Sequence, residues 1–201
     1  MSTSSLPKKR PYRMSARAKA AAATRERLLA AAWQHFASHP YEDVRLQEIA
    51  ADAGVTAQTL HTQFGSKDQL LTAAYMWFGQ QEITQRDMDP AGDIKQAIEV
   101  LFDRYEAHGT AILRMLSQED RIPAIAQMTD AGRAYHRYWV QTTFEPQLNG
   151  LSGEPYERRL ATILLATDLL AWKLLRQDMQ LDRENSEQII AEMLQSLPPA
   201  R

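Results

Sequence analysis

Two apolar residues set the helical phase of a short polar stretch. Leu60 and Phe64 are four residues apart, so on a helix both face the same side. The opposite face carries side chains that donate and accept hydrogen bonds: Gln58, Thr59, His61 and Thr62. Such a face suits contacts to base edges and phosphates in the major groove of DNA. A generic helical hairpin with a polar outer face remains the alternative.

The residues around this helix have the plan of two short helices joined by a turn. The first helix is expected over residues 46–53, where the small side chain of Ala50 allows close approach of the second. Gly54 ends it and suits the positive φ of a turn. Thr56 is expected to cap the second helix, which ends near Phe64. This arrangement predicts a helix-turn-helix.

Longer helical patterns lie on both sides of these two helices. Apolar periodicity predicts a helix over residues 16–38. Asp43 is a candidate cap for the first short helix. Ser66 and Gln69 have the spacing of a capping box at the start of a helix over residues 66–85. The N-terminal part therefore predicts three helices in a helix-turn-helix domain with a longer connecting helix.

The rest of the chain also has helical periodicity, beyond a break that contains Pro90 and Gly92. Helices are expected over residues 91–108, 110–117, 123–144, 155–178 and 185–197. No strand pattern is present, so we expect an all-α fold with a larger C-terminal helical domain. The expected divisions are a disordered basic arm over residues 1–15, a DNA-binding domain over 16–75 and an effector-binding and dimerisation domain over 76–201.

Composition excludes several classes of protein. The chain has 201 residues, of which 44% are hydrophobic and 24% charged, as in ordinary globular proteins. Its longest apolar stretch, residues 161–175, is interrupted by Asp168 and Lys173 and is too short to span a membrane. The N-terminal residues lack the apolar core of a secretory signal. The absence of cysteine excludes disulfides and fits a cytoplasmic location.

The formal net charge of −2 conceals an asymmetry. Residues 1–75 carry a net +4 and residues 76–201 a net −6. Within residues 1–27, eight Lys and Arg residues face a single acid, Glu26. A basic end on an acidic body suggests a polyanionic partner at that end. The alternative is a solvated tail without a specific partner.

Motifs for catalysis and metal binding are missing from the sequence. There is no nucleophilic cysteine, no GxSxG, no HExxH and no glycine-rich phosphate loop. His35 and His39 are four residues apart, but no third ligand is evident nearby. We therefore expect no enzyme, no cofactor and no metal. The rival non-enzymatic hypotheses are a helical adaptor and a non-specific DNA-binding protein without an effector response.

Three segments within residues 24–75 give the chain a family resemblance. They read TRERLLAAAWQHFA, LQEIAADAGVTAQTL and FGSKDQLL. The spacing of Phe64, Lys67 and Asp68 before Leu70 and Leu71 is the most specific part. Here the chain closely resembles the DNA-binding domain of TetR/AcrR-family transcriptional regulators. Residues 76–201 are similar only in being helical and of suitable length.

The resemblance implies a homodimer that represses transcription from a palindromic operator in double-stranded DNA and is released by a small-molecule effector. By position it implies these DNA contacts: Arg45, Gln47, Thr56, Ala57, Gln58, Thr59, His61, Thr62, Gln63 and Lys67. The family usually has Tyr at position 61, often His at 63 and commonly Thr at 45. These departures leave the operator sequence open. The basic arm would reach a minor groove or add non-specific attraction.

Two functions are expected of the C-terminal domain. The helix over residues 155–178 is apolar on most sides and the last helix carries one apolar stripe, so pairing with a second copy and burial within one copy are both open. Candidate dimer residues are Leu164, Leu165, Leu169, Ile190, Met193, Leu194 and Leu197. An effector of apolar, aromatic or cationic chemistry would bind among large, soft side chains that also suit ordinary core packing. These candidates are Phe102, Tyr105, Met115, Met128, Tyr135, Trp139, Asp168 and Trp172.

Asp168 is a single carboxylate in an apolar stretch and shares a helix face with Trp172. A buried carboxylate needs a partner. Arg137, Arg176, a residue across the dimer and a cationic ligand are the candidates. Effector binding would weaken DNA binding by favouring a different spacing of the two recognition helices, through the helix over residues 66–85.

Overall fold

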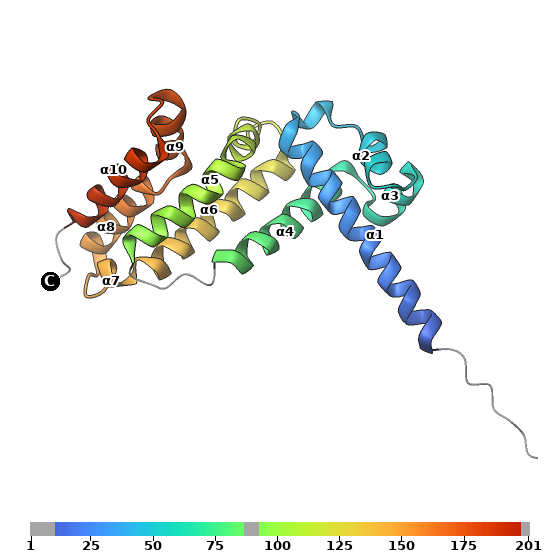
Figure 1. The fold of residues 1–201 in the computed structure, drawn as a ribbon, viewed down its shortest axis with the longest axis horizontal. Coiled ribbons are helices and arrows are strands. Elements are labelled where there is room, and N and C mark those ends of the chain that lie inside the picture. The colour runs from blue at the N-terminus through green and yellow to red at the C-terminus, as the bar shows by residue number, and fades with distance from the viewer. Residues whose placement is uncertain (1–10, 87–92, 198–201) are drawn as a thin grey trace, which may run out of the picture. The chain divides into compact units, whose positions relative to one another are not determined.

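The computed structural model describes residues 11–86 and 93–197, and every regular element among them is helical (Figure 1). This confirms the expected all-α fold. The chain divides into two compact units, Met1–Phe78 and Gly79–Arg201. Helix α4 (Lys67–Arg86) passes from one unit into the other. Among the described residues, no helix has the length and apolar character required to cross a membrane.

The N-terminal unit contains α1 (Pro11–Ser38), a 3₁₀ turn η1 (Tyr41–Asp43), α2 (Leu46–Asp52), α3 (Ala57–Phe64) and the first part of α4. Helix α1 begins at Pro11, so the expected start at residue 16 is wrong. Proline suits the first helical position, and the alanine-rich residues that follow favour helix. Residues 1–10 of the expected disordered arm lie outside the described residues.

The core of the N-terminal unit lies where α1 crosses the other helices. Trp33 of α1 stacks on Phe78 of α4 with ring centres 4.1 Å apart. The remaining core is built from apolar side chains that are almost fully buried: Leu28, Ala32, Phe36, Ile49, Ala50, Leu60, Phe64, Leu70 and Leu71. Both helices of the helix-turn-helix therefore pack against the same apolar centre.

Local hydrogen bonds fix the ends of α3 and α4. The hydroxyl of Thr56 accepts a bond from the backbone N–H of Thr59 at 3.2 Å, which confirms the expected cap. Ser66 and Gln69 form a reciprocal capping box: Ser66 Oγ accepts at 3.1 Å and Gln69 Oε1 accepts at 3.2 Å. Gly65, at the end of α3, has φ of 73°, which favours glycine.

The expected cap at Asp43 is wrong. Asp43 belongs to η1, and α2 follows Arg45, whose side chain makes no capping hydrogen bond. The carboxylate thus lies two residues before the capping position of α2. The apolar spacing within α2 predicts the helix itself, but it does not define the first residue of the helix.

The C-terminal unit contains α5 (Ile94–Leu116), α6 (Pro123–Thr143), α7 (Glu145–Leu148), α8 (Gly153–Ala166), α9 (Leu169–Lys173), a single π-helical turn η2 (Leu174–Asp178) and α10 (Arg183–Gln195). The expectation of separate helices over residues 91–108 and 110–117 is wrong, because α5 continues through Gly109. That glycine is required by packing: a Cβ placed there would lie 2.7 Å from the ring of Trp172.

The single helix expected over residues 155–178 is also wrong. Helix α8 ends at Ala166, and the carboxylate of Asp168 caps α9 by accepting from the N–H of Leu170 at 2.7 Å. At the break, the hydroxyl of Tyr105 donates to the buried carbonyl of Thr167 at 2.9 Å. The break therefore has its own polar anchors and is not a distortion of one helix.

One hydrophobic core joins the long helices of the C-terminal unit. Helix α10 packs on α5 and α8, and α6 packs on both α5 and α8. Figure 1 shows these helices side by side within the unit. The core includes Leu101, Phe102, Val140, Phe144, Leu160, Ile163, Ile190 and Leu194, all nearly inaccessible to solvent.

Candidate nucleic-acid interface

The recognition helix α3 presents a polar face to solvent, as its periodicity predicts. Leu60 and Phe64 are 1% and 6% exposed and anchor the helix in the core. The exposed side chains are Ala57, Gln58, His61, Thr62 and Gln63, whereas Thr59 is half-buried. Thr56, Arg45 and Gln47 are exposed just before α3 or at the start of α2.

Hydroxyl groups on α3 are already engaged within the helix. Thr59 Oγ1 lies 2.9 Å from Thr56 Oγ1, and Thr62 Oγ1 donates to the carbonyl of Gln58 at 2.8 Å. The amide of Gln58 makes a long contact of 3.5 Å to Thr62 Oγ1. His61 and Gln63 are exposed beside them. The long polar side chains are therefore better able to reach a base edge than the threonines are.

Lys67 differs from the other proposed contacts because it is half-buried at the start of α4. Its Nζ lies 4.5 Å from the centre of the Tyr41 ring and donates to the carbonyl of Glu42 at 3.4 Å. Burial lowers the pKa of the ammonium, and the carboxylates of Glu42, Asp43 and Asp68 oppose that shift. Lys67 thus connects η1 to α4.

Tyr41 is itself bonded to the first turn of α4. Its hydroxyl donates to the carboxylate of Asp68. Burial raises the pKa of the Tyr41 phenol, and the hydrogen bond to Asp68 raises it further, so the phenol stays neutral. The Tyr41 ring and the Asp68 carboxylate both lie next to Lys67, where they hold its ammonium near the protein surface.

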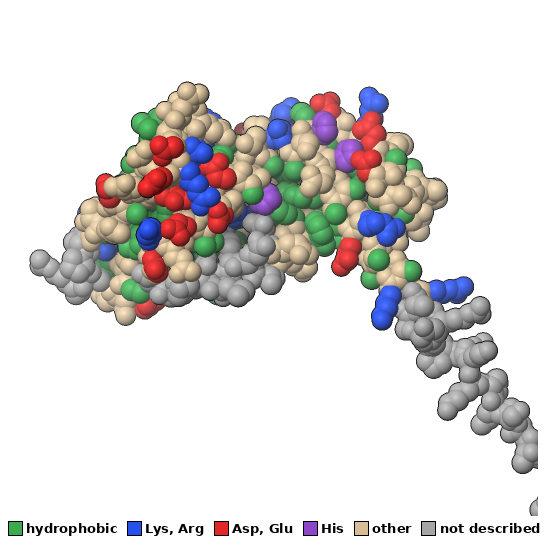
Figure 2. Space-filling model, in the orientation of Figure 1, with side chains coloured by type: hydrophobic (Ala, Val, Ile, Leu, Met, Phe, Trp, Pro, Cys, Tyr) green, Lys and Arg blue, Asp and Glu red, His purple; other side chains and the backbone are tan. Residues whose placement is uncertain are grey.

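Two arginines of α1 contact the helix-turn-helix, and neither was predicted as an individual DNA contact. The guanidinium of Arg25 lies 4.7 Å from the centre of the Phe64 ring. Arg27 Nε donates to the carbonyl of Ala53 at the end of α2, at 3.3 Å. Each arginine is far in sequence from the residue it contacts, so these contacts could not be predicted from spacing. The excess of basic residues near the N-terminus was the only sequence signal for the two arginines. Figure 2 shows Lys and Arg side chains along the exposed N-terminal part of α1.

The effector candidates of the C-terminal unit fall into three groups. Phe102, Tyr105, Trp139 and Trp172 belong to one buried cluster, in which the rings of Tyr105 and Trp172 are 6.0 Å apart. Met115 and Met128 are buried outside that cluster. Tyr135 and Asp168 are half-buried.

The partner of Asp168 within the chain is a backbone N–H and not an arginine. Its carboxylate caps α9, as described above. Arg137 pairs with Glu157 at 3.2 Å, and Arg176 pairs with Glu106. Both arginines considered as partners are therefore occupied by other carboxylates.

The dimer candidates are divided between core and surface. Leu169, Ile190 and Leu194 are buried within the unit, so they pack inside one copy. Leu165 and Met193 are 71% and 47% exposed. Leu164 and Leu197 are half-buried. Three further exposed apolar residues were not predicted as dimer candidates: Leu170, Leu174 and Met179. The break after α8 changes the helix phase, so a single continuous helix gave the wrong faces for them.

Comparison with known proteins agrees with this geometry. Residues 28–74 match the model of the family described as "Bacterial regulatory proteins, tetR family". The match spans the C-terminal part of α1, both helices of the helix-turn-helix and the start of α4. No curated protein matches the chain.

Solved structures with the same fold cover almost the whole chain. A TetR transcription regulator from Haloarcula marismortui ATCC 43049 matches with a TM-score of 0.70 and 18% identity, over 88% of this chain and 98% of that one. A transcriptional regulator from Rhodococcus sp. Rha1 matches with a TM-score of 0.65 and 19% identity, over 86% and 94%. Residues 28–74 therefore form a helix-turn-helix domain of the kind described for the tetR family of bacterial regulatory proteins, within a chain that has the fold of these solved structures.

Proposed function

We propose that this protein is a sequence-specific transcriptional regulator that binds an inverted-repeat operator as a homodimer. The observation that carries the proposal is α3: a short, capped helix, anchored by Leu60 and Phe64, with a polar exposed face in a tetR-type domain. A helix of this kind fits the major groove, where Gln58 is suited to read a base edge. In the proposed dimer the two copies of α3 lie about 34–36 Å apart, one turn of DNA.

The proposed dimer interface is the exposed apolar surface formed by Leu165, Leu170, Leu174, Met179 and Met193. These side chains are between 47% and 71% exposed in one copy. A surface of several large apolar residues is typical of a protein interface. A second copy is its proposed partner, because a two-fold axis brings the same surface of both copies together.

The proposed mode of action is repression that ends when a small molecule binds the C-terminal unit. The proposed effector site is the buried aromatic cluster around Tyr105 and Trp172, whose large rings suit an apolar or aromatic effector, and the Tyr105 hydroxyl connects it to a polar network at Thr167. In that network His136 Nε2 lies 3.1 Å from Thr167 Oγ1. An effector that favours another spacing of the two α3 helices weakens operator binding, and DNA weakens effector binding equally. We place this activity in the cytoplasm.

Selection of random duplex DNA by the purified full-length protein tests the proposal. Binding of the selected sequence is then measured across a salt series. We expect an enriched inverted repeat and an affinity that falls steeply with salt, because Lys and Arg release counterions from phosphates. Gln58→Ala should relax the preference at one position of each half-site, whereas Gln188→Ala, an exposed change on α10, should not.

Other outcomes point to the rival functions. Salt-sensitive binding to all duplexes alike would favour a non-specific DNA-binding protein. A folded protein that binds no duplex at any salt concentration would favour a helical adaptor. For the effector, a candidate compound that binds free and operator-bound protein with equal affinity contradicts the proposed coupling.

A further inference from the structure

We infer that Arg25 of α1 is a DNA phosphate-binding residue, held in place for that role by the ring of Phe64. The inference rests on the proposed function and adds a residue to its DNA interface. The DNA contacts that the family resemblance implies by position begin at Arg45, so Arg25 is not among them.

The geometry of Arg25 leaves its hydrogen-bond donors available. Its guanidinium lies over the Phe64 ring, 4.7 Å from the ring centre, and the side chain is exposed. Among the described residues, the guanidinium donates no hydrogen bond and forms no ion pair. The N–H groups of a guanidinium point outward in the plane of the group. When the guanidinium lies over an aromatic ring, they can therefore still pair with the oxygens of a phosphate.

The position of Phe64 makes this cation relevant to DNA. Phe64 is the last residue of α3, and its burial fixes the ring relative to the recognition helix. Gly65 and Ser66 follow, and then α4 begins. Arg25 therefore lies beside the C-terminal end of α3, at the residue that precedes the turn into α4.

The other cations around the helix-turn-helix are more strongly engaged. Lys67 lies over the Tyr41 ring and donates to a backbone carbonyl, with three carboxylates nearby. Arg27 is bonded to the carbonyl of Ala53, and Arg45 lies 4.0 Å from Glu48. A phosphate would have to compete with these partners at Lys67, Arg27 and Arg45. At Arg25 it competes with water alone among the described groups.

Bracing by the ring also lowers the cost of binding. A long, free side chain loses rotamer freedom when it contacts a phosphate, which reduces the gain. The contact with Phe64 restricts Arg25 before DNA arrives, and a cation over a ring face occupies none of its N–H donors with a hydrogen-bond acceptor of the protein. We therefore expect Arg25 to contribute more to DNA affinity than Lys67 does.

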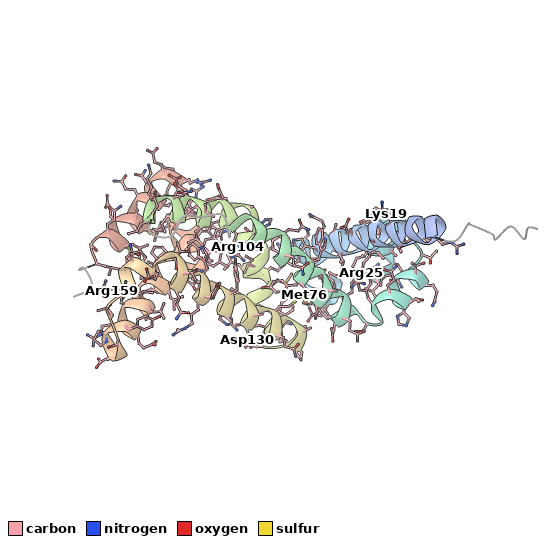
Figure 3. All side chains as sticks on the ribbon, turned by 90° about the horizontal axis from the view of Figure 1, so that it is seen from below. Lys19, Arg25, Met76, Arg104, Asp130 and Arg159 are labelled. Atoms are coloured by element: carbon pink, nitrogen blue, oxygen red, sulfur yellow. The ribbon has the colours of Figure 1, made fainter. Side chains whose placement is uncertain are left out.

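The test compares Arg25→Gln with Lys19→Gln in the full-length protein, using fluorescence anisotropy on the selected operator duplex and a scrambled duplex. Lys19 is a matched control: it is an exposed cation of the same helix, and Figure 3 shows the two side chains leaving α1 on different sides. Loss of one phosphate contact in each copy should lower the slope of log affinity against log salt by about 2. Affinity should fall about 10-fold or more on both duplexes, because a phosphate contact is insensitive to sequence.

Arg25→Lys separates charge from positioning. Lysine keeps the positive charge but lacks the planar group that lies over the ring. We expect the salt slope of the wild-type protein with an intermediate affinity. Lys67→Gln should reduce affinity less than Arg25→Gln. A melting curve of each variant checks the fold, and Arg25→Lys still tests the contact if the glutamine variant fails to fold.

The outcomes distinguish this inference from the proposed function. If the wild-type protein binds duplex DNA but Arg25→Gln keeps its affinity and salt slope, the inference is overturned and the proposed function stands. An equal loss in Arg25→Gln and Lys19→Gln also overturns it, because the effect would then be general charge. If the wild-type protein binds no duplex, the proposed function itself fails.

Discussion

The recognition helix and the exposed surface of the C-terminal unit are both helical, yet they present opposite chemistry to solvent. Helix α3 buries Leu60 and Phe64 and exposes polar side chains. Across the break between α8 and α9, Leu165 and Leu170 are 71% and 59% exposed. A polar face exchanges hydrogen bonds with water for hydrogen bonds with a polar partner, whereas an apolar face gains by leaving water. We infer that the first surface meets DNA and the second meets protein.

The two surfaces also differ in what supports them. Helix α3 is held by local caps at Thr56 and in the following turn. The apolar surface rests on a non-local contact, because Trp172 of α9 lies against Gly109 of α5. Changes below each surface should therefore act through different structural units.

The largest expected effect is on the proposed protein interface. Leu170→Glu places a charge on the apolar surface of both copies at once. The loss of a buried leucine in each copy would weaken the dimer by about 3–6 kcal/mol, on the order of 100-fold or more in dissociation constant. Sedimentation at several concentrations measures it. Gln188→Glu on the polar side of α10 is the control, and an unchanged dimer in Leu170→Glu would show that the interface lies elsewhere.

The contact below that surface should show the next largest effect. In Gly109→Ala the added Cβ would lie 2.7 Å from the ring of Trp172, so the helices must shift. Overpacking of this kind costs about 1–3 kcal/mol. Urea unfolding should show the loss in the C-terminal unit. Gly79→Ala is the matched change in α4, where a Cβ meets nothing within 4 Å. It should stabilise its helix by up to about 1 kcal/mol; equal effects would contradict the close contact.

The cap below the polar surface should have a smaller effect. Thr56→Ala removes the hydroxyl that accepts from the N–H of Thr59. The loss should be about 1 kcal/mol in the stability of the N-terminal unit, with weaker DNA binding because α3 frays at its first turn. Thr56→Ser retains the acceptor and serves as the control in the same urea titration. If serine and alanine behave alike, the cap does not hold α3.

The smallest change is expected in how the stability of the C-terminal unit depends on pH. The hydrogen bond from Arg176 holds the pKa of Glu106 below its ordinary value of 4.5; burial opposes the shift and the Trp172 indole supports it. A lowered pKa in the folded state contributes stability above the unfolded value, and this is lost as the pH falls through the folded value. As the pH is lowered below 4.5, the free energy of unfolding should therefore fall less steeply in Glu106→Gln than in the wild-type protein. Glu154→Gln, at an exposed surface pair, is the control.

The sequence was sufficient for the helix-turn-helix because its signals are local. The four-residue spacing of Leu60 and Phe64, the cap at Thr56 and the capping box of Ser66 with Gln69 each act within one turn of helix. Local signals were less reliable where tertiary packing overrides them. Gly109 resembled a helix end, but the ring of Trp172 occupies the space of its missing side chain and α5 continues.

Local signals in the amino-acid sequence were enough to predict the all-helical class, the position of α3 and the polar face that α3 exposes. Tertiary structure decided which apolar residues are core and which are surface: Leu169 and Ile190 are buried, whereas Leu170 and Leu174 are exposed. It also decided that Lys67 is engaged by Tyr41 and that Arg25 lies over Phe64. The physical reason is distance along the chain. Caps and helix phase depend on neighbours a few residues away, but burial and cation–ring contacts depend on helices that meet only after folding.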